Sequence, residues 1–170
     1  MAIKITSKVV AKKKNWEAVK KNLISAQSKS TDVGWWDGFH INGRSDGIPL
    51  AQIAQWVEEG HINGGAFTGT VTPPRPFMTI ALEAALRQNG WLEKKVKANA
   101  TLVFAKKLTW DGFFKKLGPD LVILVQRVME EFSNPSNSEV TIALKGFDNP
   151  TIETGHLLSK VDWRIAERKK

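Results

Sequence analysis

At 170 residues, with 42% hydrophobic and 25% charged residues, the chain has the size and composition of one globular domain, which excludes disorder throughout. It contains no cysteine, which excludes disulfides and thiolate metal sites and fits a reducing compartment. The formal net charge is +8, and residues 1–30 hold eight lysines against one glutamate, so this end could meet nucleic acid or an acidic protein surface, or simply be solvated.

Apolar residues at helical spacing predict an amphipathic helix over residues 9–27. The lysines of this region lie mostly away from the apolar stripe. Five of them are candidate basic contacts: Lys12, Lys13, Lys14, Lys20 and Lys21. Lysine beside tryptophan also occurs where nucleic-acid bases stack, but Trp16 lies on the stripe and is more simply a core residue.

Residues 28–32 are interpreted as a loop, and the β-prone segment Val33–Phe39 as a strand. In a strand, Trp35 and Trp36 point to opposite faces, so we expect at least one of them to meet something besides the core of the subunit. Aromatic residues are enriched at subunit interfaces, which makes an interface a reasonable partner.

Pro49 is expected to open a helix with an apolar face that ends at Gly60. The Gly- and Thr-rich stretch His61–Thr72 predicts a loop or an exposed hairpin. Residues 73–76, Pro-Pro-Arg-Pro, form neither helix interior nor central strand and predict a rigid extended lead into a helix from Phe77, which Gly90 bends.

Gly118-Pro119 is expected to break the helical pattern between a short helix around Trp110 and the clearest apolar helix face, from Leu121 to Phe132. The longest apolar run, Leu121–Val125, is too short to span a membrane, and no signal peptide is visible. Residues 135–165 are interpreted as a connector, a turn at Thr154-Gly155 and a final strand over Leu157–Ile165.

Sequence patterns typical of catalytic or metal sites are weak in this chain. His40 and His61 each open the tetrapeptide His-Ile-Asn-Gly, and the second copy follows Glu58 and Glu59, a set that could bind a metal but is more simply a pair of Asn-Gly turns. Thr154-Gly155-His156 places a hydroxyl near an imidazole, but the segment is more simply a turn that leads into the strand. The chain lacks a phosphate-binding loop and a nucleophile elbow, so we expect neither catalysis nor a cofactor.

Several separated segments carry a family pattern. Residues 50–60 end in Glu59-Gly60, and residues 72–78 contain Pro-Arg-Pro-Phe. Leu117-Gly118 then precedes an apolar helix, and the series is completed by residues 137–146 and by residues 152–157, which read Ile-Glu-Thr-Gly-His-Leu. Together these segments resemble the neck and tail-completion proteins of tailed bacteriophages, over about residues 33–165. Two positions depart from that pattern: Glu59 replaces an aromatic residue, and His156 stands where arginine is usual.

The resemblance implies a non-enzymatic virion protein with an α+β fold, in which a small, mainly antiparallel sheet is packed by helices and loops extend to neighbours. Residues 1–170 would form one domain with basic flexible ends near 1–8 and 166–170. The subunit would assemble as a cyclic hexamer or dodecamer in the virion neck, between the head connector and the tail tube or sheath, around DNA that it does not read. Candidate assembly residues are Trp35, Trp36, Arg75, Phe77, Thr154, Gly155 and His156. The alternative is a basic nucleic-acid-binding module that uses the N-terminal helix.

Overall fold

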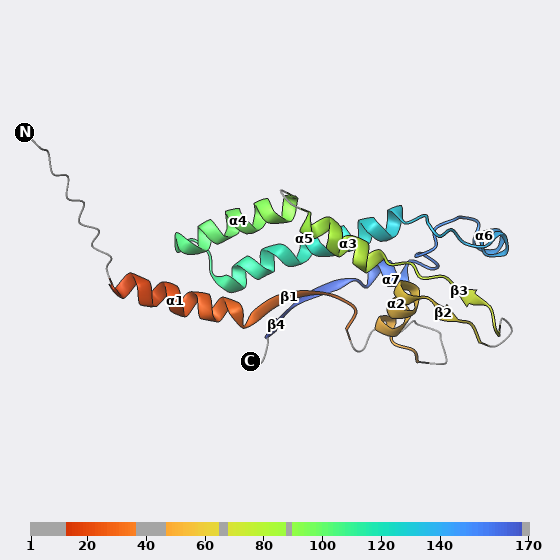
Figure 1. Cartoon of the computed structure of the whole chain (residues 1–170), viewed down its shortest axis with the longest axis horizontal. Coiled ribbons are helices and arrows are strands. Elements are labelled where there is room, and N and C mark those ends of the chain that lie inside the picture. Colours follow the sequence, from red (N-terminus) through yellow and green to blue (C-terminus); the bar gives the residue numbers. More distant parts are fainter. Residues whose placement is uncertain (1–12, 37–46, 65–67, 88–89, 168–170) are drawn as a thin grey trace, which may run out of the picture.

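The computed structural model describes residues 13–36, 47–64, 68–87 and 90–167, and these form an elongated α+β body (Figure 1). Its helices are α1 (Lys13–Gln27), α2 (Leu50–Glu59), α3 (Phe77–Leu86), α4 (Trp91–Phe104), α5 (Trp110–Glu131), α6 (Glu139–Lys145) and α7 (His156–Ser159). Its strands are β1 (Lys29–Gly34), β2 (His61–Ile62), β3 (Val71–Thr72) and β4 (Asp162–Glu167). The α+β class predicted from the sequence is therefore confirmed.

Two separate antiparallel pairs of strands replace the single small sheet. The longer pair joins β1 to β4, with Thr31 opposite Ile165 and Val33 opposite Trp163. The predicted loop over residues 28–32 is wrong, because the strand begins at Lys29 and ends at Gly34, before the two tryptophans. Pairing with β4 determines where the strand begins and ends, because strand propensity depends strongly on tertiary context.

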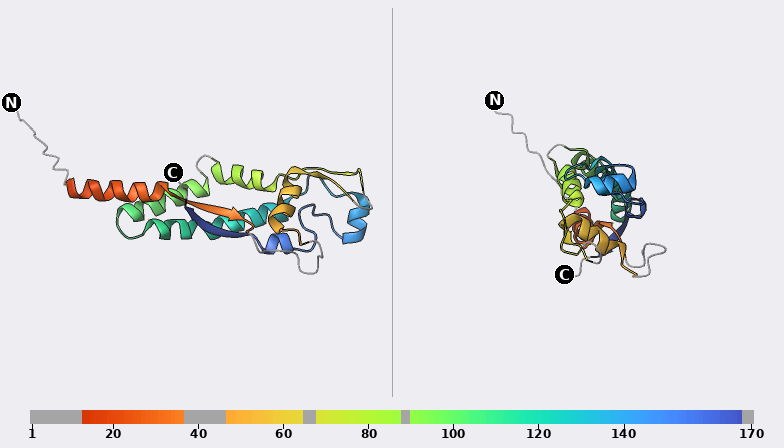
Figure 2. Two further views of the ribbon diagram at one scale, coloured as in Figure 1. Left: turned by 90° about the horizontal axis from the view of Figure 1, so that it is seen from below. Right: turned by 90° about the vertical axis from the view of Figure 1, so that its right-hand side faces the viewer.

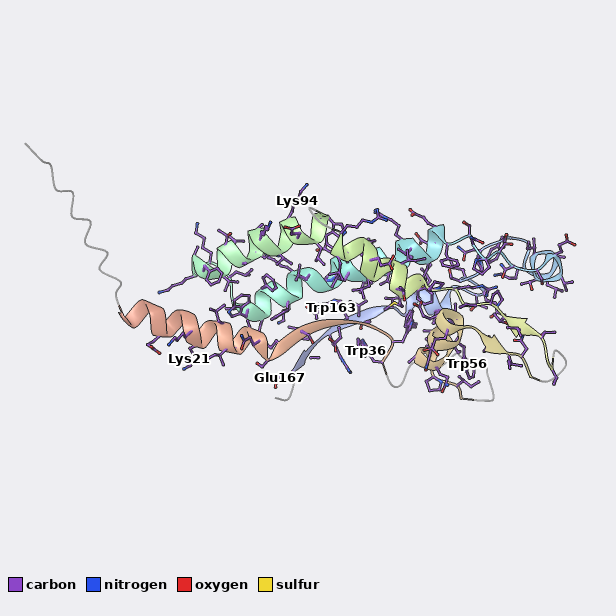
Figure 3. The ribbon with its side chains drawn as sticks, in the orientation of Figure 1. Lys21, Trp36, Trp56, Lys94, Trp163 and Glu167 are labelled. Atoms are coloured by element: carbon purple, nitrogen blue, oxygen red, sulfur yellow. The ribbon has the colours of Figure 1, made fainter. Side chains whose placement is uncertain are left out.

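Helix α5 is continuous, and the predicted break at Gly118-Pro119 is wrong. Gly118 is buried where β4 crosses the helix, and a Cβ built on it would fall 2.0 Å from Cδ2 of Trp163. Figure 3 shows Trp163 reaching from β4 toward α5. Glycine is therefore required at position 118 for close packing, and the packing on both sides of Pro119 holds the helix through a residue that usually interrupts one.

The core consists of two clusters along the body. The larger contains Trp35, Leu50, Phe77 and Met129, with Leu157 and Leu158 packed against it. The smaller lies where α4 meets the first half of α5 and contains Val103, Phe113 and Leu117. Because α5 contributes to both clusters, it acts as the spine of the molecule.

Of the remaining predicted boundaries of helices, strands and turns, some are confirmed and others are wrong. Helix α2 begins after Pro49 and ends before Gly60, and residues 61–72 contain the hairpin β2–β3, as expected. The helix predicted from Phe77 is not bent at Gly90 but divided into α3 and α4. The turn at Gly155 is confirmed, with a φ of +77°.

Residues 135–165 contain two helices that the sequence interpretation lacked. Helix α6 begins after Ser138, whose hydroxyl accepts a hydrogen bond from the N–H of Thr141, and ends at Gly146 in the left-handed conformation. Leu157 lies in α7 rather than in a strand, so the expected alternation over Leu157–Ile165 is wrong and β4 begins only at Asp162. An N–H to carbonyl bond from Ser159 to Gly155 closes the α7 turn.

We expect Gly118→Ala to lower the free energy of unfolding by roughly 1–3 kcal/mol, because the added methyl group would overlap the indole of Trp163. Urea denaturation measures the change. In a Trp163→Ala background the same substitution should cost much less, since the obstructing ring is gone. An equal cost in both backgrounds would show that the indole is not the constraint.

Gly155→Ala should destabilise the protein by about 1 kcal/mol, because its φ is positive while the space around a Cβ is empty. Gly64→Ala is a matched control, since its φ is ordinary and its surroundings are equally open. Thermal or urea unfolding that shows the same effect for both variants would contradict the conformational explanation.

Candidate assembly surface

Trp35 and Phe77 lie in the core of the subunit itself. The Nε1 of Trp35 donates to the carbonyl oxygen of Leu157 at 2.8 Å. Its ring meets Phe77 edge-on, with centroids 5.9 Å apart and an interplanar angle of 84°. Phe77 is fully buried, so these two candidate assembly residues anchor the end of β1 and the start of α3 rather than present a surface to a partner.

Trp36 turns away from Trp35 and is half-buried. The guanidinium of Arg164 lies over its ring, 3.9 Å from the centroid, a favourable cation–π arrangement. The indole Nε1 of Trp36 is buried and makes no hydrogen bond within the described residues. Of the tryptophan pair, Trp36 is therefore the candidate for contact with another molecule.

Arg75 connects the proline-rich segment to the C-terminal region. Its backbone N–H donates to the carbonyl oxygen of Val57 at 2.9 Å, and its Nη2 donates to Oδ1 of Asn137 at 3.3 Å. Asn137 donates in turn to Oδ1 of Asp148, through its backbone N–H at 2.9 Å and its Nδ2 at 3.1 Å. Burial lowers the pKa of Arg75, and the charge of Asp148 opposes that shift. Arg75 is thus connected to the Asp148 carboxylate through the amide of Asn137.

Asn149 and Thr151 fix the C-terminal region to the end of α5. The Nδ2 of Asn149 donates to the carbonyl oxygens of Met129 and Glu130, at 3.0 and 2.9 Å. The hydroxyl of Thr151 donates to the Met129 carbonyl oxygen at 2.6 Å. These bonds satisfy carbonyls that a helix end leaves without partners in the helix. The sequence interpretation gave Asn149-Pro150 no such role, although an Asn-Pro pair signals a turn.

Thr154, Gly155 and His156 do not form a reactive group. Thr154 is exposed, Gly155 precedes α7, and His156 occupies the first position of that helix. Within the described residues no hydrogen bond joins the hydroxyl of Thr154 to the imidazole of His156. The three residues have in common only that they lie in the main-chain turn that leads into α7.

The strongest feature that the sequence interpretation missed is exposed apolar surface at one end of the body. We call this end the tip, and define it as the hairpin β2–β3 together with α6 and Phe147. Helix α6 buries none of its side chains. The exposed fractions are 66% for Val140, 80% for Leu144, 42% for Phe147, 75% for Ile62 and 70% for Val71. Figures 1 and 2 place the hairpin and α6 at the same end of the long axis.

The candidate basic residues lie toward the other end. Lys13, Lys14, Lys20 and Lys21 are part of α1, and Lys12 lies outside the described residues. Lys20 and Lys21 are exposed, with Nζ of Lys20 4.0 Å from a carboxylate oxygen of Glu17. Further exposed lysines, absent from the sequence-based candidates, occur around the α4–α5 turn: Lys97, Lys106, Lys107, Lys115 and Lys116.

An ion pair of Lys29 with Asp111, 2.5 Å between Nζ and Oδ1, connects β1 to the start of α5. Their side-chain hydrogen bond raises the pKa of Lys29 and lowers that of Asp111. The pair therefore remains charged at neutral pH and holds the α1–β1 segment against the smaller core cluster.

The proposed histidine motif is only partly described. His40 lies outside the described residues, and Nδ1 of His61 is 3.3 Å from the carbonyl oxygen of Trp56. Among the residues that the structure describes, no group of three or more His, Asp or Glu side chains is placed to hold a metal ion. In the same residues, no helix is both long enough and apolar enough to cross a membrane.

Comparison with protein-family models, with curated proteins and with solved structures finds no match to this chain.

We expect Asn149→Ala to lower the free energy of unfolding by roughly 1–3 kcal/mol, because the Glu130 carbonyl at the end of α5 would lose its side-chain donor and the Met129 carbonyl would keep only that of Thr151. Ser136→Ala is the control, since that exposed serine lies in the preceding loop. Its substitution should change stability by no more than about 0.5 kcal/mol. Equal stability of the two variants in urea would contradict the role given to Asn149.

Proposed function

We propose that the protein is a non-enzymatic structural subunit of a tailed-phage virion, one that forms a cyclic ring at the head–tail junction and leaves a channel for DNA. The observation that carries the proposal is the distribution of apolar side chains. Among the described residues, thirteen hydrophobic residues are buried in the core, and thirteen large hydrophobic residues are exposed. A subunit that completes its burial by assembly accounts for this balance.

The free energy that burial of these exposed side chains would contribute supports assembly rather than chance exposure. Full burial of a side chain such as Val or Leu contributes about 1.5–3 kcal/mol relative to exposure. Val140 and Leu144 lie four residues apart, on the same side of α6, and Phe147 follows two residues after the helix. A partner that covered this one element would therefore gain several kcal/mol.

The segments that carry the phage resemblance also meet in space, which supports the proposal. Glu58 accepts hydrogen bonds from the N–H groups of Met78 and Thr79, at 2.8 and 3.0 Å, and so caps the start of α3. Arg75 links the same region to Asn137. The segments thus form one connected base from which the hairpin and α6 project (Figure 1).

A second candidate function is binding of nucleic acid without sequence preference. The observation that favours it is the group of exposed lysines in α1 and around the α4–α5 turn. Such contacts release counterions, so binding should weaken steeply with salt. Under the leading proposal the same lysines meet an acidic protein surface, or touch DNA only weakly.

A tagged copy of the full chain, expressed during infection by a phage that encodes it, tests the proposal. The tag should appear in purified virions, and class-averaged electron micrographs should place it in a ring at the neck. A matched duplex-binding assay on the purified chain should show weak, sequence-blind binding that moderate salt abolishes. Absence of the tag from virions, together with tight duplex binding at physiological salt, would support the second candidate instead.

A further inference from the structure

The two ends of the body carry opposite charge. Near the tip, six exposed carboxylates outnumber the cations Arg75, Arg127 and Lys145, and they belong to Glu59, Glu130, Glu131, Glu139, Asp148 and Glu153. At the opposite end, seven exposed lysines belong to α1 and to the α4–α5 region: Lys20, Lys21, Lys97, Lys106, Lys107, Lys115 and Lys116. Two of these lysines are paired locally, Lys20 with Glu17 and Lys97 with Glu93, and Asp111 is paired with Lys29. The other five, Lys21, Lys106, Lys107, Lys115 and Lys116, still outnumber the remaining acidic side chains of that end. The ends are therefore complementary to each other.

A cavity opens at the basic end, between α1 and the α4–α5 turn, with a volume of about 350 Å³. Val103, Leu108 and Trp110 contribute apolar lining. Lys106 adds positive charge, whereas Lys29 is paired with Asp111 in the same lining. Ser25 of α1 and Thr109 add hydroxyl groups. A cavity that combines these apolar side chains with an exposed lysine suits an apolar side chain that has a carboxylate beside it.

Helix α6 presents such a side chain at the other end. Leu144 is the most exposed large hydrophobic residue in the described part of the chain, and Val140 lies one turn before it. Glu139 begins the same helix. Figures 1 and 2 place α6 and the α4–α5 turn at opposite ends of the long axis, so the two surfaces of one subunit cannot meet each other.

We propose that α6 of one subunit seats Leu144 in the cavity of the next subunit, with Glu139 facing Lys106. The inference deepens the proposed ring and rests on that function for its biological setting. Each subunit uses its tip once and its cavity once, which makes the contact heterologous and lets it close into a ring. Opposite charges at the rim orient the two subunits, while burial of Leu144 supplies the attraction.

Cross-linking tests the contact directly, because the chain has no cysteine of its own. A Leu144→Cys chain is mixed with a Ser25→Cys chain and treated with an oxidant or a short bismaleimide. Both positions are exposed, so neither variant should disturb folding. We expect a covalent dimer from the mixture and not from either variant alone. As a control, Leu144→Cys is mixed with Gln52→Cys, which places the second cysteine on the exposed side of α2. The proposal is overturned if the first mixture yields no more dimer than the control.

Charge reversal provides a second arm of the same experiment. Adding Lys106→Glu to the Ser25→Cys chain should reduce the dimer yield, and adding Glu139→Lys to the Leu144→Cys chain should restore it. A restored dimer yield shows that Lys106 and Glu139 face each other. A dimer yield that falls further when Glu139→Lys is added shows that they do not. This experiment and the virion experiment can fail separately. A cross-linked dimer from a protein that does not enter virions would support this contact and exclude the phage role. Entry into virions without a cross-linked dimer would exclude this contact alone.

Discussion

The contact between Gly118 and the indole of Trp163 determines how the strands and helices of this protein fit together. The ring lies where any side chain at position 118 would have to stand, so β4 can approach α5 closely. β1 pairs with β4, and its Thr31 hydroxyl donates to the carbonyl oxygen of Phe114 in α5. The β1–β4 pair is therefore held against the middle of the spine, and both core clusters form around it.

The same arrangement explains why the ends remain available. A long helix with one two-stranded pair along it gives an extended body with two small cores rather than one large one. The hairpin β2–β3 and α6 project beyond the larger cluster, where nothing in the described part of the subunit covers them (Figure 2). Because small cores stabilise a fold only modestly, association that buries further apolar area would add appreciably to stability.

Local signals in the sequence were sufficient for some elements. Pro49 and Gly60 bound α2 as their conformational preferences require, and Gly155 adopts the positive φ that a turn demands. Elements that depend on distant partners were not predictable in this way. β1 is polar and pairs with a strand that lies 128 to 138 positions later, from Gly34 with Asp162 to Lys29 with Glu167. Pro119 remains helical because packing outweighs its local preference.

The candidate site residues show the same difference between local and long-range signals. Trp35 and Phe77 were selected for their residue type, which does not distinguish a core anchor from an interface residue, and the structure places both in the core. The exposed face of α6 was missed because Val140, Ile142 and Leu144 also fit an alternating pattern, so neither the helix nor its exposure followed from the sequence. Charge separation between the ends required the three-dimensional arrangement.

The central claim is that the tip of this subunit is covered by another protein subunit in its working state. Hydrogen exchange of the backbone amides, compared between the purified chain and the same chain in assembled virions, measures this most directly. We predict strong additional protection of residues 139–145 and of the residues around the α4–α5 turn after assembly. Equal exchange of both segments in the two states would contradict the account.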